Sequence, residues 1–412
     1  MTTGFVGGFA ITAELLTTTV APGLAPEPAI AELLQLASQL ADDFAARAAA
    51  VDCSGAFPAA EFEQLAAAGF LAAPLVRGLG GCGLGTDAAT TYDLLRLLKH
   101  VGRGNLAIGR VYEGHVNALQ LIQTFGTAEQ IDRYGREARD QHKLFGVWNA
   151  EDAEGLRILP LGGGRYRLEG AKTFCSGGGY VERPFVNGKL PDGTWQMCIV
   201  PMDQVQTSCD RSWWQPLGMR ATASYKIDFS GVELGATALI GQPGDYLRQP
   251  WLTAGVVRFA AVQLGGAEAL FDLTRQYLQG EQRTEHPYQQ ERLGQMAIAI
   301  ESGNLWLRGA ADRLVAYDPQ FGGSPRDGEA CPDQLVAYAN MMRTAIEQIC
   351  IDTMQLCQRS VGTRGLMSPH ALERVTRDLT LYLRQPAYDA AIAGAGAYVL
   401  TQTTPADRLW HR

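Results

Sequence analysis

The sequence predicts a mostly helical α+β fold with an N-terminal helical domain, a central β-domain and a C-terminal bundle of long helices. Three observations carry this prediction. Apolar residues recur at helical spacing in the first third of the 412-residue chain, and a period-2 pattern with frequent turn signals fills residues 143–240. Long helical patterns then return to the end of the chain. We place the boundaries at 1–25 for an N-terminal extension, 26–142, 143–246 and 247–412.

The N-terminal helical domain begins with apolar residues on one helix face in 29–47, among them Leu33, Ala37 and Phe44. A shorter helix is predicted around 62–69, a third after a cap at Thr86 or Asp87, and a fourth over 108–125. The glycine-rich stretch 77–85 between them formally matches G-x-G-x-x-G. Because it follows a helix and lacks the acid of a βαβ unit, we interpret it as a loop between helices.

The central region changes period. In 165–169 and 225–230 apolar and polar residues alternate, and glycine-rich turns such as 162–164 and 191–193 separate the segments. Four long helices are predicted after it, over 254–278, 291–316, 332–357 and 369–383. Three of them exceed the usual helix length, which is typical of a bundle of extended antiparallel helices.

Composition excludes several functions. The 46% hydrophobic content suffices for large cores, and the net charge of -8 argues against nucleic acid or an anionic membrane as partner. The eight cysteines are scattered without a C-x-x-C pair, the histidines lack metal-ligand spacing, and no apolar run reaches the roughly 20 residues of a membrane helix. Residues 1–24 lack the basic start of a signal peptide. We therefore expect a cytoplasmic protein without a bound metal.

Two segments between the helical blocks combine aromatic and polar side chains. Residues 146–151 contain Trp148 and Asn149, and residues 168–178 contain Phe174 and Ser176. Aromatic faces and polar tips on neighbouring strands could hold a planar cofactor, although residues such as Trp148 and Phe174, taken alone, are more often part of the core.

The order of the motifs resembles that of the acyl-CoA dehydrogenase superfamily. Residues 168–178, LEGAKTFCSGG, are similar to its strand motif L-x-G-x-K-x-W-I-T-x-G. The family's other segments follow the same order in this chain: F-G-T-x-E-Q at 125–130, L-G-M-R at 217–220 with F-x-x-V at 229–232, and Q-L-C, E-R and R-D at 355–357, 373–374 and 377–378.

The resemblance implies a tightly bound FAD between the β-domain and the C-terminal bundle. The residues that match the family's cofactor site are Val147, Trp148, Asn149, Phe174, Cys175 and Ser176. Arg283 and Gln355 match segments that complete the FAD site of a neighbouring subunit, so a homodimer or homotetramer is implied.

The sequence departs from the family at the position of the catalytic base. Pro386 stands where the family's R-D segment places the glutamate that abstracts the substrate α-proton, and the alternative position in 253–258 carries no acid. Asp389 is the nearest carboxylate and the candidate base, although a surface or capping role is also open. Arg258 and Arg384 are the predicted substrate-binding residues.

We therefore predict an FAD-dependent oxidoreductase that acts on an acyl thioester or related small substrate, with an electron-transferring flavoprotein as a possible partner. The alternatives are a flavin-dependent monooxygenase or oxidase of the same fold, and a non-catalytic binding protein that keeps the fold. Replacement of the base by Pro386 predicts weak or absent acyl-CoA dehydrogenation.

Overall fold

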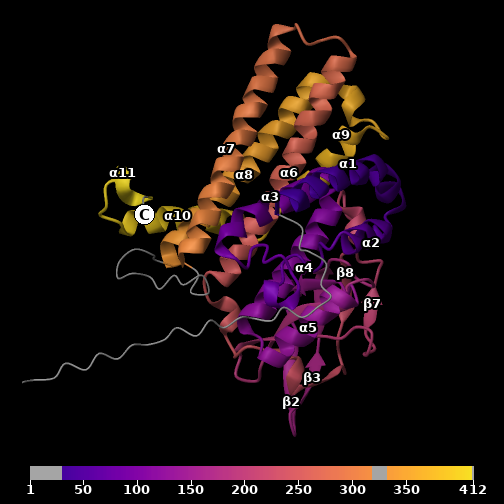
Figure 1. Cartoon of the computed structure of the whole chain (residues 1–412), viewed down its shortest axis with the longest axis vertical. Coiled ribbons are helices and arrows are strands. Elements are labelled where there is room, and N and C mark those ends of the chain that lie inside the picture. The colour runs from indigo at the N-terminus through magenta and orange to yellow at the C-terminus, as the bar shows by residue number, and fades with distance from the viewer. Residues whose placement is uncertain (1–29, 318–331, 411–412) are drawn as a thin grey trace, which may run out of the picture.

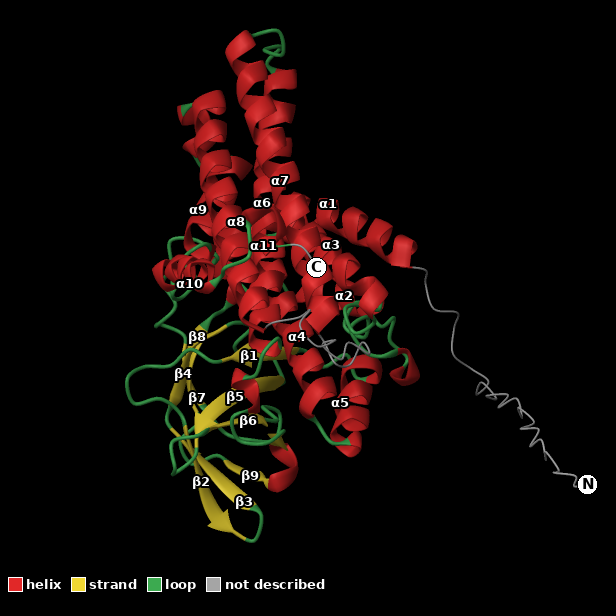
Figure 2. Cartoon of the chain, turned by 90° about the vertical axis from the view of Figure 1, so that its left-hand side faces the viewer, coloured by secondary structure: helices red, strands yellow, loops and turns green. Residues whose placement is uncertain are grey.

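The computed structural model describes residues 30–317 and 332–410. The predicted extension 1–25 and the predicted start of the first helix at Ala29 lie outside these residues. Helices form one end of the molecule, from which the long helices α6 and α7 project, and the strands gather at the other end (Figures 1 and 2). The predicted fold class is confirmed.

Five helices precede the strands: α1 (Ile30–Ser54), α2 (Ala59–Ala67), α3 (Thr91–Gly104), α4 (Leu106–Phe125) and α5 (Ala128–Asp140). The glycine-rich stretch lies between α2 and α3, as predicted. The cap prediction for α3 was wrong, because this helix begins at Thr91, after a 3-10 turn over Ala88–Thr90. At α5 a capping box joins Thr127 and Gln130 and explains why the F-G-T-x-E-Q segment starts a helix.

The strands form two sheets. The larger sheet has the order β10-β6-β5-β2-β3-β9, with β1 paired to β5 in parallel, and the smaller has the order β4-β8-β7. The strands are β1 (Phe145–Trp148), β2 (Arg157–Gly162), β3 (Arg165–Glu169), β4 (Ala171–Cys175), β5 (Arg183–Lys189), β6 (Trp195–Ile199), β7 (Ser208–Asp210), β8 (Tyr225–Asp228), β9 (Glu233–Gly235) and β10 (Leu239–Ile240). The two cofactor segments predicted from sequence therefore end strands β1 and β4, one in each sheet.

The C-terminal part consists of α6 (Trp251–Gly280), α7 (Pro287–Tyr317), α8 (Pro332–Val361), α9 (Ala371–Tyr382), α10 (Tyr388–Thr401) and α11 (Ala406–Leu409). The sequence analysis did not predict α10 and α11. Helix α10 is rich in alanine and glycine and buries only Ala391 and Ala395, so it carries no helical stripe of large apolar residues.

Helix α6 is the central helix and packs against α3, α4, α7, α8 and α9. It is long and apolar enough to cross a membrane by length and composition, contrary to the expectation from the sequence, but most of that stretch is buried inside the fold. Glycines allow its close approach to α3, since a Cβ at Gly265 would lie 2.2 Å from the carbonyl oxygen of Lys99. Helix α4 packs against both α6 and β1 and so connects the bundle to the larger sheet.

Candidate functional site

A buried polar cluster lies on the face of α4 that packs against α6 and β1. Arg110, Glu113 and Asn117 follow each other at spacings of three and four residues, so they share one face of this otherwise apolar helix. Glu113 is only 3% exposed and accepts hydrogen bonds from Arg110 and, at 2.5 Å, from Nδ2 of Asn117. On α6, Nη1 of Arg258 donates to Oδ1 of Asn117 at 2.6 Å.

This cluster has a fixed donor direction. Arginine can only donate, so Asn117 presents its oxygen to Arg258 and its amide hydrogens to Glu113. Arg110 and Asn117 therefore both donate to the carboxylate of Glu113, and Arg258 fixes the orientation of Asn117. Burial raises the pKa of Glu113, against the opposing effect of Arg110 and Arg258. Burial also raises the pKa of Tyr382 on α9, whose hydroxyl has no hydrogen-bond partner among the described residues.

Helix α4 is held to β1 by His115, and Gly114 lies at the same contact. The ring of His115 accepts from the backbone N–H of Phe145 at 3.1 Å and bonds the carbonyl of Leu71 at 2.8 Å. Burial lowers the pKa of His115 to about 4, so the ring is neutral at pH 7 and its role is structural. A Cβ added at Gly114 would lie 3.7 Å from the backbone nitrogen of Val147.

The end of β1 carries a second set of polar contacts. Asn149 donates to the hydroxyl of Tyr246 and accepts from Asn187 at 2.9 Å. Its carbonyl accepts from Nζ of Lys172 at 3.3 Å, and Lys172, which is fully buried, pairs with Glu151 at 2.5 Å. The side chain of Asn149 is thus fixed before any ligand arrives. Burial raises the pKa of Tyr246 to about 12.

Trp148 does not present its ring to a ligand. It is 1% exposed, packs against Phe229, and donates its indole N–H to the carbonyl of Ser176 at 2.9 Å. The contact brings the two cofactor segments predicted from sequence together. Cys175 beside it is buried in the core, and burial raises the pKa of its thiol.

Three buried hydroxyl groups form a chain that ends at Ser176. Thr222 donates to the carbonyl of Met219 at 2.9 Å, and Ser224 lies 2.7 Å from Thr222 and 2.8 Å from Ser176. Each hydroxyl carries one hydrogen, and a carbonyl can only accept. If every bond is made, Ser224 donates to Thr222, Ser176 donates to Ser224, and the oxygen of Ser176 can only accept from a further partner.

Phe174 forms an exposed aromatic surface beside this chain. Its side chain is 52% exposed and its φ is 51°, a left-handed conformation that costs about 1–3 kcal/mol in a non-glycine residue. Trp213 and Trp214 pack edge-on against it, with ring centroids at 4.7 and 6.1 Å. An apolar ring held in this way is available for stacking rather than used for the core.

A basic hollow of about 890 Å³ begins at Trp214 and lies between α1, α9 and the loop before β8. Arg377 in this hollow pairs with both Asp52 and Glu373. Arg374 is 8% exposed, and no hydrogen bond or ion pair to it is found among the described residues. Arg211 and Arg220 also line the hollow. The acidic groups are largely engaged by Arg377, so the hollow favours an anion.

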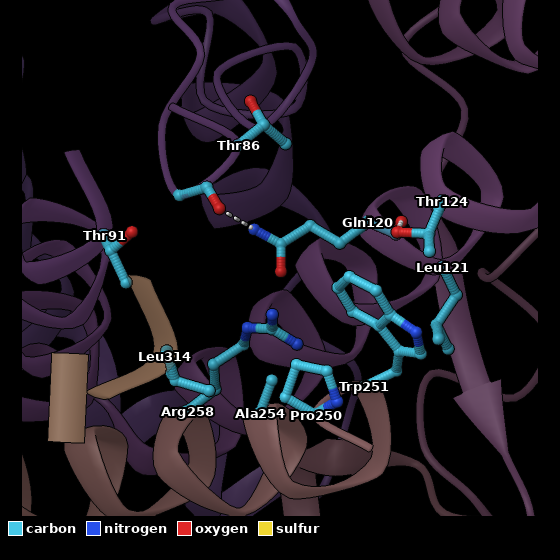
Figure 3. Close-up of a pocket in the computed structure, with 11 residues that line it drawn as sticks. Thr86, Thr91, Gln120, Leu121, Thr124, Pro250, Trp251, Ala254, Arg258 and Leu314 are labelled. Atoms are coloured by element: carbon cyan, nitrogen blue, oxygen red, sulfur yellow. Dashed lines mark hydrogen bonds between the residues drawn. The ribbon is translucent and has the colours of Figure 1, made fainter. Parts of the chain in front are cut away.

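A smaller cavity, of about 50 Å³, opens on the other side of the polar cluster. Arg258 rises into it from α6, and the side-chain oxygen of Gln120 on α4 points toward the Arg258 guanidinium (Figure 3). Trp251 and Pro250 form another part of its wall. Arg258 therefore belongs both to this cavity and to the polar cluster of α4.

The other residues predicted from the sequence lie elsewhere. Arg384 is paired with Glu347 of α8 and is mostly exposed. Arg283 follows α6 and donates to the carbonyl of Ser360 at 3.4 Å, and Gln355 is exposed on α8. The connection between α6 and α7 that carries Arg283 lies at the end of the molecule opposite the strands (Figure 1). Within one chain, Arg283 is therefore not brought to Ser176.

Several residues of this site were not found from the sequence: Arg110, Glu113 and Asn117, Thr222 and Ser224, and Tyr246. One signal was available for the first three. Charged and amide side chains on one face of a helix that is otherwise buried indicate a functional or ion-paired cluster. The hydroxyl chain left no such signal, because Thr222 and Ser224 are common loop residues.

Comparison with known proteins places the chain in a family. Residues 29–139 match the family model "Acyl-CoA dehydrogenase, N-terminal domain" and residues 257–384 match "Acyl-CoA dehydrogenase, C-terminal domain", so the two cover more than half of the chain. The chain belongs to the acyl-CoA dehydrogenase family. The resemblance inferred from the motif order is thereby confirmed.

Similar proteins within this family include monooxygenases. The chain is 25% identical over 389 residues to dibenzothiophene monooxygenase of Mycolicibacterium goodii, which covers 86% of this chain and 90% of that protein. It is 24% identical over 401 residues to the probable FMNH2-dependent monooxygenase SfnC of Pseudomonas putida, covering 92% and 97%. Among solved structures, TdsC of Paenibacillus sp. A11-2 in complex with FMN and indole has a TM-score of 0.81 and 21% identity, covering 92% of this chain and 99% of that one.

Proposed function

We propose that the protein is a flavin-dependent monooxygenase of the acyl-CoA dehydrogenase family, the alternative that the sequence left open. The observation that carries the proposal is the missing base. Pro386 lies in the turn between α9 and α10, and its carbonyl accepts from Arg343 at 3.1 Å. Both oxygens of Glu113 are already bonded, and Asp389 is exposed on the first turn of α10. Dehydrogenation needs a base positioned at the substrate α-proton, whereas oxygen insertion does not need a base at that position.

The relatives support the same choice. Dibenzothiophene monooxygenase and SfnC match most of this chain, and SfnC is named a probable FMNH2-dependent monooxygenase, which specifies a reduced flavin. These names also favour a flavin in general over the FAD predicted from the sequence, because the similar TdsC structure holds FMN.

The residues present fit a flavin, and a reduced flavin in particular. Phe174 offers an exposed ring for stacking, and Ser176 offers a hydroxyl oxygen that can only accept once the chain through Ser224 and Thr222 is formed. The reduced flavin carries an N–H at the ring nitrogen that in the oxidised form is a bare acceptor. The basic hollow next to Trp214, with Arg374 and Arg220, suits the phosphate of the flavin tail.

A bound reduced flavin supplies two electrons, so that one atom of dioxygen enters the substrate, the other leaves as water, and the flavin returns to its oxidised form. The chain's own residues orient and shield this chemistry. When a flavin is bound, Ser176 would accept a hydrogen bond from its ring, and Asn149, fixed by Tyr246 and Asn187, would offer an amide to hold it. Glu113 fixes the orientation of Asn117, which in turn binds Arg258. Ser176 and Glu113 are buried, which keeps water away from these two groups.

The test is an anaerobic titration of the purified protein with reduced and oxidised FMN and FAD. We expect the reduced form to bind about tenfold more tightly, since the oxidised form would leave Ser176 facing another acceptor. Thr222→Val removes the end of the hydroxyl chain, frees Ser176 to donate, and should abolish this preference, whereas Thr222→Ser should keep it. Failure of every flavin form to bind would contradict the proposal, and so would rapid bleaching of bound oxidised flavin by an acyl-CoA.

A further inference from the structure

The small cavity beside Arg258 contains a buried acceptor whose direction is fixed. The side-chain nitrogen of Gln120 donates to the carbonyl of Gly85 at 3.0 Å, so its oxygen must point the other way. That oxygen is buried and has no hydrogen-bond partner among residues 30–317 and 332–410. Figure 3 shows it directed into the pocket, toward Arg258.

A second unpartnered group lines the same cavity. The hydroxyl of Thr91 on α3 is buried and has no partner in the described part of the chain, and Thr91 itself is 6% exposed. Thr124, by contrast, has already donated its hydroxyl hydrogen to the backbone of Gln120 at 2.8 Å. Each buried polar atom without a partner costs about 1–3 kcal/mol, so an arrangement of this kind is stable when a ligand or water satisfies it.

The size of the cavity limits what can satisfy these groups. One water occupies at least about 10–15 Å³ of cavity volume. The cavity, with about 50 Å³, therefore has room for a few waters or for a polar fragment of three or four heavy atoms. A fused three-ring compound such as dibenzothiophene does not fit here as a whole. The polar wall also differs from what an acyl chain would require, because an acyl chain would leave the buried side-chain oxygen of Gln120 without a donor.

We propose that this cavity binds the polar end of a small substrate that carries an N–H donor beside a carbonyl oxygen, as a carboxamide does. The N–H donates to the side-chain oxygen of Gln120, and the carbonyl oxygen accepts from the guanidinium of Arg258. The hydroxyl of Thr91 provides a further hydrogen-bonding group for the same polar end. A carboxylate fits less well because it would place a negative oxygen against the oxygen of Gln120. The inference rests on the proposed function only in treating the bound molecule as a substrate.

The experiment compares three probes of nearly equal size by calorimetry on the full chain without flavin. Propionamide offers both groups, butanone replaces the amide nitrogen by a methyl group, and propionate replaces it by an anionic oxygen. We expect propionamide to bind at least about tenfold more tightly than the other two, because a site built to bond a donor rejects the analogue that lacks it. Quenching of Trp251, absent in Trp251→Phe, should report the same order.

Variants assign the preference to these residues. Gln120→Met should make propionamide and butanone bind equally, and Thr91→Val should weaken propionamide severalfold. The matched control is Thr353→Val, which removes an equally buried, unpartnered hydroxyl from α8 and should change nothing. If Gln120→Met does not fold, Thr91→Val and the three-probe comparison decide.

Equal binding of the three probes, or binding of none of them, would overturn the inference and would mean that the cavity holds only water. Neither result bears on flavin binding, which the anaerobic titration measures separately. A protein that binds reduced flavin but shows no preference for propionamide would therefore keep the proposed function and lose this inference.

Discussion

Replacing Glu113 by glutamine should destabilise the protein more than a change of one atom suggests. The carboxylate receives donors from Arg110 and Asn117, and glutamine can accept only one of them while its own N–H₂ faces the other. Asn117 cannot turn its amide to compensate, since its oxygen is bound by Arg258. One buried unsatisfied group and one uncompensated buried charge together cost about 2–4 kcal/mol in the free energy of unfolding.

A double-mutant cycle with Arg258→Met tests the direction of the chain. Once Arg258 is gone, Asn117 is free to turn and present its oxygen to the amide of the new glutamine. Arg258→Met should therefore lower the free energy of unfolding less in the Glu113→Gln protein than in the wild type, with a coupling energy of about 1–2 kcal/mol. The assay is equilibrium unfolding in urea for the four proteins, followed by both circular dichroism and fluorescence to check that unfolding is two-state.

The matched control is Glu137→Gln. Glu137 is also buried and pairs with the buried Arg183 at 2.5 Å, and the other side-chain hydrogen bonds of the two residues go to Arg133, Glu182 and Asp203, outside the cluster of α4. Its combination with Arg258→Met should be additive within about 0.5 kcal/mol. Additivity between Glu113→Gln and Arg258→Met as well would refute the directed chain, and a loss below about 1 kcal/mol for Glu113→Gln alone would show that the carboxylate is not the common acceptor.

The remaining predictions concern other parts of the molecule. Burial raises the pKa of Asp378 to about 6, so the stability that this carboxyl contributes is complete below about pH 4 and is lost as the pH rises to about 6. Asp378→Asn keeps an acceptor, and its free energy of unfolding in urea should therefore rise relative to the wild type by up to about 3 kcal/mol between about pH 4 and 6. Gly218→Ala would put a Cβ 2.3 Å from a backbone oxygen of α9 and should lower stability by about 1–3 kcal/mol and weaken flavin retention in a spin-column assay. Anaerobic mixing with short and medium acyl-CoAs should leave the flavin band unbleached because Pro386 replaces the base. Sedimentation should show a dimer or tetramer that Ile298→Asp with Leu305→Asp dissociates, since these exposed apolar residues lie seven apart on one face of α7.

Much of the fold could be predicted because the period of the hydrophobic pattern changes where the architecture changes. Helix α1 shows its stripe through Leu33, Ala37 and Phe44, and all three are buried. Helix α10 could not be found in this way, because a helix of alanine and glycine buries too little side chain to leave a pattern. The predicted start of α3 was wrong because the residues before it form a turn of their own. In this turn the hydroxyl of Thr90 donates to the carbonyl of Gly83 at 2.6 Å, and the polar residues of such a turn resemble those of a helix cap.

The site was predictable only where it is local in the chain. Residues 147–149 and 174–176 follow single strands, and the bond from Trp148 to Ser176 joins them. The cluster around Glu113 depends instead on α4 and α6, which are separated by more than 100 residues. No spacing rule relates Glu113 to Arg258. Their partnership follows from the packing of α4 on α6, and that packing is fixed by small residues and buried apolar side chains far from the chemistry.

The polar groups of this molecule acquire defined roles from the far ends of their hydrogen-bond chains. The carbonyl of Gly85 makes Gln120 an acceptor toward the cavity, and the carbonyl of Met219 makes Ser176 an acceptor toward its open side. Serine and glutamine can each donate or accept, so their residue type alone does not decide which ligand they prefer. The fixed end decides, because reversing one bond in the middle would leave a buried group unpaired. Selectivity for an N–H on a flavin or on a substrate can therefore be changed by substitutions that contact neither molecule, provided that they change the end of the chain.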